Sequence, residues 1–146
     1  GKSSLLKLLT DDALSHSGTV TVGSGLLISV VAQDSSSLSG TLTEFAEKYG
    51  LEESLFKAVL RQMDFERVQF DKRMEDFSEG QKKKVLLARS LCERAHLYVW
   101  DEPLNYIDII SRAQIEELIL AFRPSLLFVE HDSAFLRNIA TKIVRI

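Results

Sequence analysis

An acidic pair at the end of a predicted strand has the clearest chemical potential in this sequence. The apolar run from His96 to Trp100 is rich in strand-forming residues and ends at Asp101 and Glu102. Ligands of open α/β sheets bind at the carboxyl ends of the strands. Asp101 could therefore reach the shell of a Mg²⁺ ion, and Glu102 could activate or orient a water molecule that attacks a phosphate. The simpler alternative is an acidic pair that caps a helix.

Two other polar residues also follow predicted strands. Gln33 comes directly after the strand expected at Leu26 to Ala32, and its neutral amide suits contact with water or Mg²⁺. His131 follows the strand expected at Ser125 to Val129, where an imidazole could contact a γ-phosphate and its attacking water. A lone histidine is more often structural than catalytic, so neither residue carries the argument by itself.

The first four residues, Gly1-Lys2-Ser3-Ser4, match the tail of the phosphate-binding loop G-x-x-x-x-G-K-[ST]. In such a loop backbone N–H groups surround the phosphates, the lysine reaches the β- and γ-phosphates, and the hydroxyl holds Mg²⁺. A tripeptide such as Gly-Lys-Ser also occurs by chance, so a flexible chain end is the alternative for this motif alone.

A fourth motif, Phe77-Ser78-Glu79-Gly80-Gln81, comes directly before a predicted helix. Ser78 and Gln81 have the spacing of a capping box, which explains the motif without any ligand. A helix N-terminus with a free hydroxyl and the backbone N–H of Gly80 is also a phosphate site, and both interpretations can hold together.

The elements that carry these residues alternate between strands and helices, which indicates an α/β fold with a mostly parallel sheet flanked by helices. Residues 42–77 interrupt this alternation with apolar residues at helical spacing, so we expect a small inserted helical segment there. The other predicted helices lie at Lys2 to Leu9, Glu79 to Glu93, Ile115 to Phe122 and Phe135 to Ala140, and further strands at Gly18 to Val22 and Ile143 to Ile146.

The composition excludes several classes of protein. The chain has 146 residues, of which 45% are hydrophobic and 27% charged, with a net charge of −3 that gives no overall attraction to nucleic acid. No apolar run approaches the roughly 20 residues of a membrane-spanning helix, and we expect no signal peptide and no membrane insertion. The single cysteine, Cys92, excludes an internal disulfide and suggests a reducing, cytoplasmic location.

Taken in order, these motifs resemble those of ATP-binding cassette (ABC) ATPases. Residues 1–4 match the end of the Walker A motif, Gln33 the Q-loop, residues 77–81 the signature motif, and residues 98–102 Walker B. Asn105 to Asp108 matches the D-loop and His131 the switch histidine. The resemblance covers essentially the whole chain and implies a P-loop NTPase (RecA-like) fold with an inserted helical subdomain.

The sequences of these motifs are most similar to those of the second cassette of ABC-F proteins. Proteins of this family carry two cassettes in one polypeptide and no membrane domain. The run Asp101 to Asp108 resembles their D-E-P-T-N-H-L-D, and His131 to Leu136 resembles their H-D-x-x-F-L. Among ABC-F proteins the chain is most like those that bind the ribosome and displace antibiotics. It departs from the family pattern at Glu79, which replaces a glycine, and at Leu104 and Tyr106 in the D-loop.

The resemblance implies an ATPase that works as a head-to-tail pair of cassettes with Mg-ATP between them. Phosphate contacts then fall to Gly1, Lys2, Ser3 and Ser4, Mg²⁺ contacts to Ser3, Gln33 and Asp101, and catalysis to Glu102, His131 and Gln33. Ser78, Gly80 and Gln81 would reach the ATP of the partner cassette. Expected partners are a second cassette of the same polypeptide and the ribosome with its RNA.

The chain begins within the phosphate loop, so we expect residues 1–146 alone to bind ATP poorly and to be inactive. The main alternative is the ATP-binding subunit of a membrane transporter, and a second is an ATP-dependent scaffold that does not hydrolyse. A chromosome-maintenance ATPase is disfavoured because the stretch between Gln33 and Phe77 is too short for a long coiled coil. Lys82, Lys83 and Lys84 are interpreted as a solvated helix face.

Overall fold

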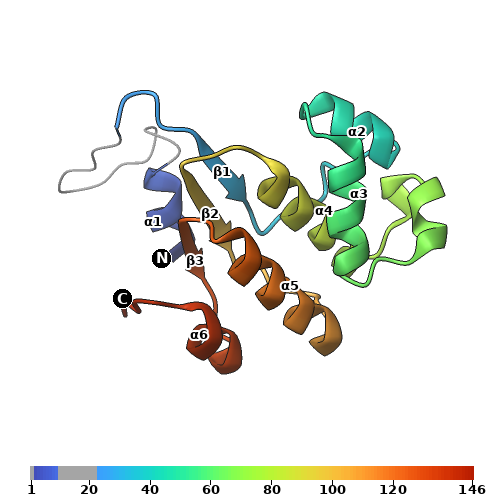
Figure 1. Cartoon of the computed structure of the whole chain (residues 1–146). Coiled ribbons are helices and arrows are strands. Elements are labelled where there is room, and N and C mark those ends of the chain that lie inside the picture. Colours follow the sequence, from blue (N-terminus) through green and yellow to red (C-terminus); the bar gives the residue numbers. More distant parts are fainter. Residues whose placement is uncertain (1, 10–22) are drawn as a thin grey trace.

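A parallel three-stranded sheet forms the centre of the structure, a computed structural model that describes residues 2–9 and 23–146 (Figure 1). The strands are β1 (Ile28–Val31), β2 (Leu97–Asp101) and β3 (Leu126–Val129), in the order β1-β2-β3. Val30 pairs with Val99, which in turn pairs with Leu127. This register brings the carboxyl ends of all three strands to one edge of the sheet.

Helices pack around this sheet and against one another. Helix α4 (Glu79–Cys92) contacts β1, α1 (Lys2–Leu8) contacts β2, and α5 (Ile109–Phe122) contacts α6 (Ser133–Ile139). The remaining helices, α2 (Leu42–Lys48) and α3 (Glu53–Gln62), lie on the side of α4 away from the sheet, together with the 3₁₀ turns η1 (Arg67–Asp71) and η2 (Met74–Asp76) (Figure 1).

Side-chain caps fix where several of the helices begin. Asp108 accepts a hydrogen bond from the N–H of Ser111 at the start of α5, and Asp132 accepts one from the N–H of Phe135 at the start of α6. Each cap satisfies a backbone donor that has no partner within its helix. The loops after β2 and β3 therefore end at defined points, which restricts the paths of the residues between strand and helix.

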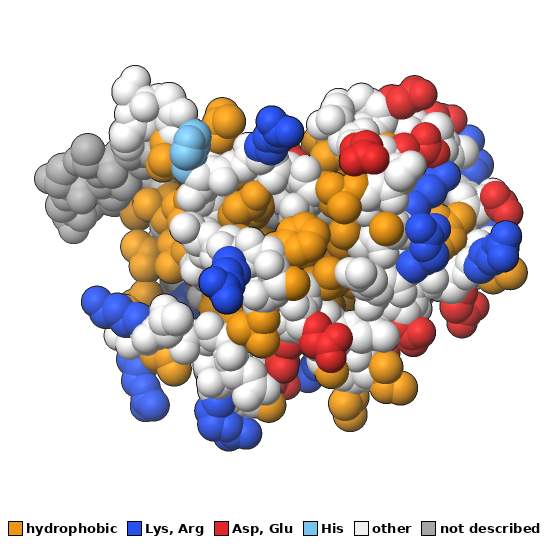
Figure 2. Space-filling view, viewed as in Figure 1, with side chains coloured by type: hydrophobic (Ala, Val, Ile, Leu, Met, Phe, Trp, Pro, Cys, Tyr) orange, Lys and Arg blue, Asp and Glu red, His pale blue; other side chains and the backbone are white. Residues whose placement is uncertain are grey.

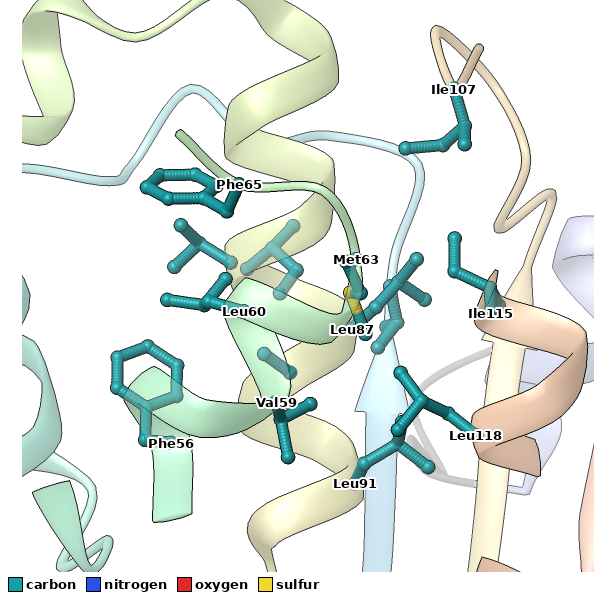
Figure 3. Packing of buried hydrophobic residues seen from close by; sticks show 14 of the residues in the cluster. Phe56, Val59, Leu60, Met63, Phe65, Leu87, Leu91, Ile107, Ile115 and Leu118 are labelled. Atoms are coloured by element: carbon teal, nitrogen blue, oxygen red, sulfur yellow. The ribbon is translucent and has the colours of Figure 1, made fainter. Parts of the chain in front are cut away.

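One apolar cluster joins the sheet to the helical segment that follows β1. Figure 3 shows Val59, Leu60 and Met63 from the α3 region facing Leu87 and Leu91 of α4 and Ile115 and Leu118 of α5. The same cluster contains Val31 and Trp100 from the sheet, both at most 1% exposed. Burial of these side chains stabilises α4 at the junction, because each contributes about 1.5–3 kcal/mol.

On the helical segment of α2, α3 and the 3₁₀ turns, acidic and basic side chains lie next to one another on the surface (Figure 2). No helix in the described part of the chain is both long enough and apolar enough to cross a membrane.

Most of the predicted elements are confirmed, with their ends shifted by up to six residues, as at the start of α5. The strands expected at Leu26 to Ala32 and Ser125 to Val129 are β1 and β3, and the acidic pair follows β2 as predicted. The strand predicted at Ile143 to Ile146 is wrong. No strand forms there in the structure, and Val144 and Ile146 are 71% and 78% exposed. The strand predicted at Gly18 to Val22 lies outside the described residues.

Candidate functional site

Three predicted ligand residues meet at the carboxyl edge of the sheet. Ser3 lies in the first turn of α1, Gln33 follows β1, and Asp101 is the last residue of β2. The Nε2 atom of Gln33 donates to Ser3 Oγ at 3.3 Å and to Asp101 Oδ1 at 3.2 Å. A hydroxyl, an amide and a carboxylate are side chains that can carry oxygen ligands for Mg²⁺, and here the amide nitrogen of Gln33 faces the other two.

The residues of the predicted phosphate loop are only partly described. Lys2 and Ser4 lie exposed in the first turn of α1, next to Ser3, whereas Gly1 lies outside the described residues. Lys2 directly precedes Ser3, so a cationic residue lies at the start of α1 next to one member of the Ser3–Gln33–Asp101 group.

Two of the three predicted catalytic residues, Glu102 and His131, are also in contact. The Nε2 atom of His131 lies 3.2 Å from Glu102 Oε1, and Asn105 Nδ2 donates to Glu102 Oε2 at 2.9 Å. The backbone of Glu102 has a φ of 48°, a conformation that costs energy for a residue with a side chain. Its N–H nevertheless bonds to Val129 O at 2.8 Å, so pairing with β3 holds the backbone in place.

Glu130 is a residue of this site whose role the sequence did not predict. Its Oε1 accepts from the N–H of His131 at 2.9 Å, and its Oε2 accepts from the N–H of Leu104 at 3.1 Å. One carboxylate therefore connects the loop after β3 with the loop after β2, which places His131 near Glu102. Its position directly between a strand and His131 was the available signal in the sequence.

The signature residues form a second group. Ser78 Oγ accepts from Gln81 N at 3.1 Å and Gln81 Oε1 accepts from Ser78 N at 2.9 Å, so the predicted capping box is present. Ser78, Gly80 and Gln81 line a cavity of about 240 Å³. None of Ser3, Gln33, Asp101, Glu102 and His131 lines it. The other lining residues are Asp64, Phe65, Glu66, Lys84, Tyr106 and Asp108.

The D-loop packs directly on this helix start. A Cβ atom on Gly80 would lie 2.6 Å from the carbonyl oxygen of Tyr106, closer than side chains approach a backbone oxygen. Nearby, Lys84 Nζ lies 3.6 Å from Asp108 Oδ1. Burial acts to raise the pKa of Asp108, but hydrogen bonds from Ser111 and the charge of Lys84 outweigh it, so the pKa is lowered. Asp108 is thus held as an anion at this junction.

The prediction that Lys82 to Lys84 form a solvated face is wrong for two of the three lysines. Lys83 is 1% exposed and Lys84 is 7% exposed, and the Nζ of Lys83 donates to Ala32 O at 3.3 Å. The packing of α4 on β1 turns Lys83 inward, whereas Lys84 lies at the junction with Asp108. Burial lowers the pKa of Lys83, while the charges of Asp101, Glu102, Glu130 and Glu79 oppose that effect.

The fold and the two groups of residues define an ATP-binding cassette of the P-loop type. A sequence profile described as ABC transporter matches residues 1–105, and the chain belongs to this family. ABC cassettes bind nucleotide and are ATPases.

The chain has curated relatives along its whole length. It is 31% identical to the ATP-binding protein YdiF of Bacillus subtilis (strain 168), covering 100% of this chain and 23% of that protein. It is 29% identical to the energy-dependent translational throttle protein EttA of Escherichia coli (strain K12), covering 99% of this chain and 27% of that protein. These relatives are ABC-F type proteins, so the predicted resemblance to ABC-F cassettes is confirmed. The chain spans about a quarter of their length.

Solved structures share the fold at lower sequence identity. The RNase-L Inhibitor matches with a TM-score of 0.80 and 21% identity, over 96% of this chain and 28% of that chain. An archaeal ribosome recycling factor, aABCE1, in complex with the ribosomal stalk protein aP1 matches with a TM-score of 0.78 and 21% identity, over the same shares. The predicted fold class, a mostly parallel sheet of P-loop type flanked by helices, is confirmed.

Proposed function

We propose that this chain binds Mg-ATP and hydrolyses it as one member of a pair of cassettes. The observation that carries the proposal is the meeting of Ser3, Gln33 and Asp101 within hydrogen-bond distance, beside the Glu102–His131 contact. Residues from α1, from the loop after β1, and from the ends of β2 and β3 come together at one sheet edge. Such an arrangement suits a nucleotide phosphate with its metal ion.

In this proposal Gly1, Lys2, Ser3 and Ser4 bind the phosphates of ATP, and Ser3, Gln33 and Asp101 hold Mg²⁺. The ion would neutralise charge on the β- and γ-phosphate oxygens during the reaction. Gln33 is suited to a double role, because its amide already contacts both other ligands and its oxygen remains available to water or metal.

Glu102 is the proposed residue that accepts a proton from, or orients, the attacking water. Its side chain is only 23% exposed, and both oxygens have defined partners in His131 and Asn105. The carboxylate therefore has a fixed direction before any substrate binds, which is what efficient general base catalysis requires. His131, 65% exposed in its side chain, is free on its outer face to contact the γ-phosphate.

The separation of the two groups supports the proposed cassette pair. Ser78, Gly80 and Gln81 line a cavity that the Ser3–Gln33–Asp101 group does not line, so the two groups do not surround one phosphate. We infer that the signature residues serve ATP held by a partner cassette of the same polypeptide. Hydrolysis would then remove the phosphate contacts that hold the pair closed.

The ribosome is the proposed partner of the whole protein, in the cytoplasm. Support comes from the relative EttA, named a translational throttle protein, and from the fold shared with a ribosome recycling factor. The sequences of the motifs at Asp101 to Asp108 and His131 to Leu136 further suggest a role in antibiotic resistance by ribosome protection. In this account the closed, ATP-bound pair binds the ribosome and the open pair leaves it.

Co-sedimentation with ribosomes tests this function in the whole polypeptide that contains this chain. The variant carries Glu102→Gln and the equivalent change in the other cassette, and is pelleted with ribosomes in ATP or ADP. We expect pelleting in ATP only, after which displacement of ribosome-bound antibiotics is the next assay. Hydrolysis by the wild type with no pelleting in either nucleotide would contradict the ribosome role and favour a transporter subunit.

A further inference from the structure

The side of α4 that faces β1 contacts the segment from β1 to Ser35, at points from Glu79 to Ser90 of the helix. Ser90 Oγ lies 2.7 Å from Ser29 Oγ, and Arg89 bonds to the carbonyl of Val30. About two turns nearer the start of α4, Lys83 Nζ donates to Ala32 O at 3.3 Å. The helix and the segment therefore run past each other in opposite directions, joined by side-chain contacts.

At its first turn α4 contacts the same segment just beyond Gln33. Ser35 Oγ donates to Glu79 Oε2 at 3.1 Å, and Ser35 is 6% exposed. Glu79 and Lys83 are four residues apart and so lie on one face of the helix. Lys83 contacts Ala32, the residue before Gln33, and Glu79 contacts Ser35, the second residue after Gln33. Gln33 is thus held on both sides by one turn of α4.

We propose that Lys83 and Glu79 are positioning residues that fix Gln33 against Ser3 and Asp101 and couple this site to the signature end of α4. This rests on the proposed function. The buried ammonium of Lys83 bonds the carbonyl directly before Gln33, so its removal frees the backbone that carries the amide. The same turn of α4 follows Ser78, whose capping box fixes the start of the helix. This helix start lines the cavity of about 240 Å³. Movement at either site is therefore transmitted to the other through this turn.

The charge distribution explains why a lysine is tolerated in this position. Lys83 is nearly inaccessible, yet the carboxylates of Asp101, Glu102, Glu130 and Glu79 all act on it favourably. An isolated buried cation would be strongly unfavourable; burial still lowers the pKa of Lys83, and these four anions offset part of that cost. Lys83 therefore interacts electrostatically with the Asp101–Glu102 site, although it belongs to the lysine run that was interpreted as a solvated helix face.

A double-mutant cycle in the whole polypeptide tests the proposal through steady-state ATP hydrolysis. The variants are Lys83→Met, Gln33→Ala and the pair, with Lys72→Met as the matched control on an exposed lysine. We expect Lys83→Met to lower kcat about tenfold with KM for ATP within about twofold, because a small misplacement of a catalytic group has this effect. The double variant should be no slower than Gln33→Ala within about twofold, because Lys83 acts through Gln33.

A second variant keeps the test informative if Lys83→Met does not fold, as shown by its melting temperature. Ser35→Ala removes only the bond to Glu79, and Ser37→Ala, on an exposed serine, is its control. We expect Ser35→Ala to lower kcat about threefold, again with no further loss on top of Gln33→Ala.

Wild-type kcat in both Lys83→Met and Ser35→Ala would overturn the proposal, as would losses that multiply with that of Gln33→Ala. A Gln33→Ala variant with unchanged kcat would also overturn it. Glu102→Gln, measured beside these variants, separates this failure from failure of the proposed function, because loss of turnover in Glu102→Gln supports the function whatever the Lys83 result.

Discussion

The Nε2 atom of His131 lies 3.2 Å from Oε1 of Glu102, across the ends of two neighbouring strands. This contact exists because Glu102 N bonds to Val129 O and Glu130 holds the N–H groups of both His131 and Leu104. The backbone network of the sheet edge, rather than the two side chains alone, thus brings the residues together.

Replacing His131 with alanine should slow ATP turnover about 10- to 100-fold while leaving the Kd for ATP within about twofold. The reason is that Glu102 loses one of its two partners and the γ-phosphate loses a contact, whereas the phosphate loop is unchanged. The measurement is steady-state phosphate release alongside fluorescent-nucleotide binding. His96→Ala is the control, since His96 accepts a bond from Leu27 N at the start of β1. Equal rates for His131→Ala and His96→Ala would contradict the assignment.

Replacing Gly80 with alanine should displace the D-loop. The added Cβ would lie 2.6 Å from the carbonyl oxygen of Tyr106, a backbone atom that cannot rotate away. Overpacking of this kind costs about 1–3 kcal/mol, so we expect a lower melting temperature and slower ATP turnover. Gly23→Ala is the matched control, because no atom lies within 4 Å of its Cβ position. Identical melting temperatures for the two variants would show that the Gly80–Tyr106 contact is unimportant.

Replacing Ser90 with alanine should destabilise the protein by about 1–3 kcal/mol, because buried polar groups would lose a partner. Trp100 Nε1 donates to Ser90 Oγ at 2.9 Å, and the Ser29 hydroxyl contacts the same oxygen at 2.7 Å. All three residues are at most 3% exposed. Urea unfolding followed by tryptophan fluorescence measures the change, with the exposed Ser39→Ala as control. A loss no larger than that of the control would mean that water replaces the missing hydroxyl.

Cys92 should react slowly with iodoacetamide in the folded protein. Burial, with smaller contributions from Glu52 and Glu93, raises the pKa of the thiol to about 11 from an ordinary value of 9.0. At pH 8 the reactive thiolate is then about 100-fold scarcer than in an unperturbed thiol. Mass spectrometry of the Cys92 peptide, labelled in native buffer and in urea, measures the two rates. Similar rates in both conditions would contradict the burial.

The same shift in the pKa of Cys92 has a consequence for stability at high pH. Because the pKa is higher in the folded state, the folded protein keeps its proton between pH 9 and about 11 while the unfolded chain loses it. Stability should therefore fall as the pH rises through this range. In a Cys92→Ala variant the free energy of unfolding should no longer show this fall between pH 9 and about 11.

Much of the sheet and its polar edge could be predicted from local pattern. Asp101 and Glu102 follow a short apolar run, and Gln33 and His131 follow two others, so parallel strands bring them to one edge. The burial of Lys83 could not be predicted, because three consecutive lysines look solvated until α4 is packed on β1. The false strand at Ile143 to Ile146 has strand-forming residues, but pairing depends on a neighbour that local sequence does not specify.

Contacts between segments that are distant in the sequence could not be predicted from the local sequence pattern either. The spacing of Ser78 and Gln81 predicted the capping box, but the contact of Gly80 with Tyr106 depends on the path of the D-loop. The roles assigned to the site residues, from Lys2 to His131, stay predictions until they are tested in the protein.

The most direct test of the account is a single-turnover assay of the Glu102→Gln variant of the whole polypeptide, with ATP binding measured on the same sample. Glu117→Gln, on the exposed side of α5, is the matched control. The account predicts an ATP Kd within about twofold of the wild type and hydrolysis in this cassette slower by about 100-fold or more. Hydrolysis at the wild-type rate in Glu102→Gln would contradict the role of Glu102, and with it the proposed site.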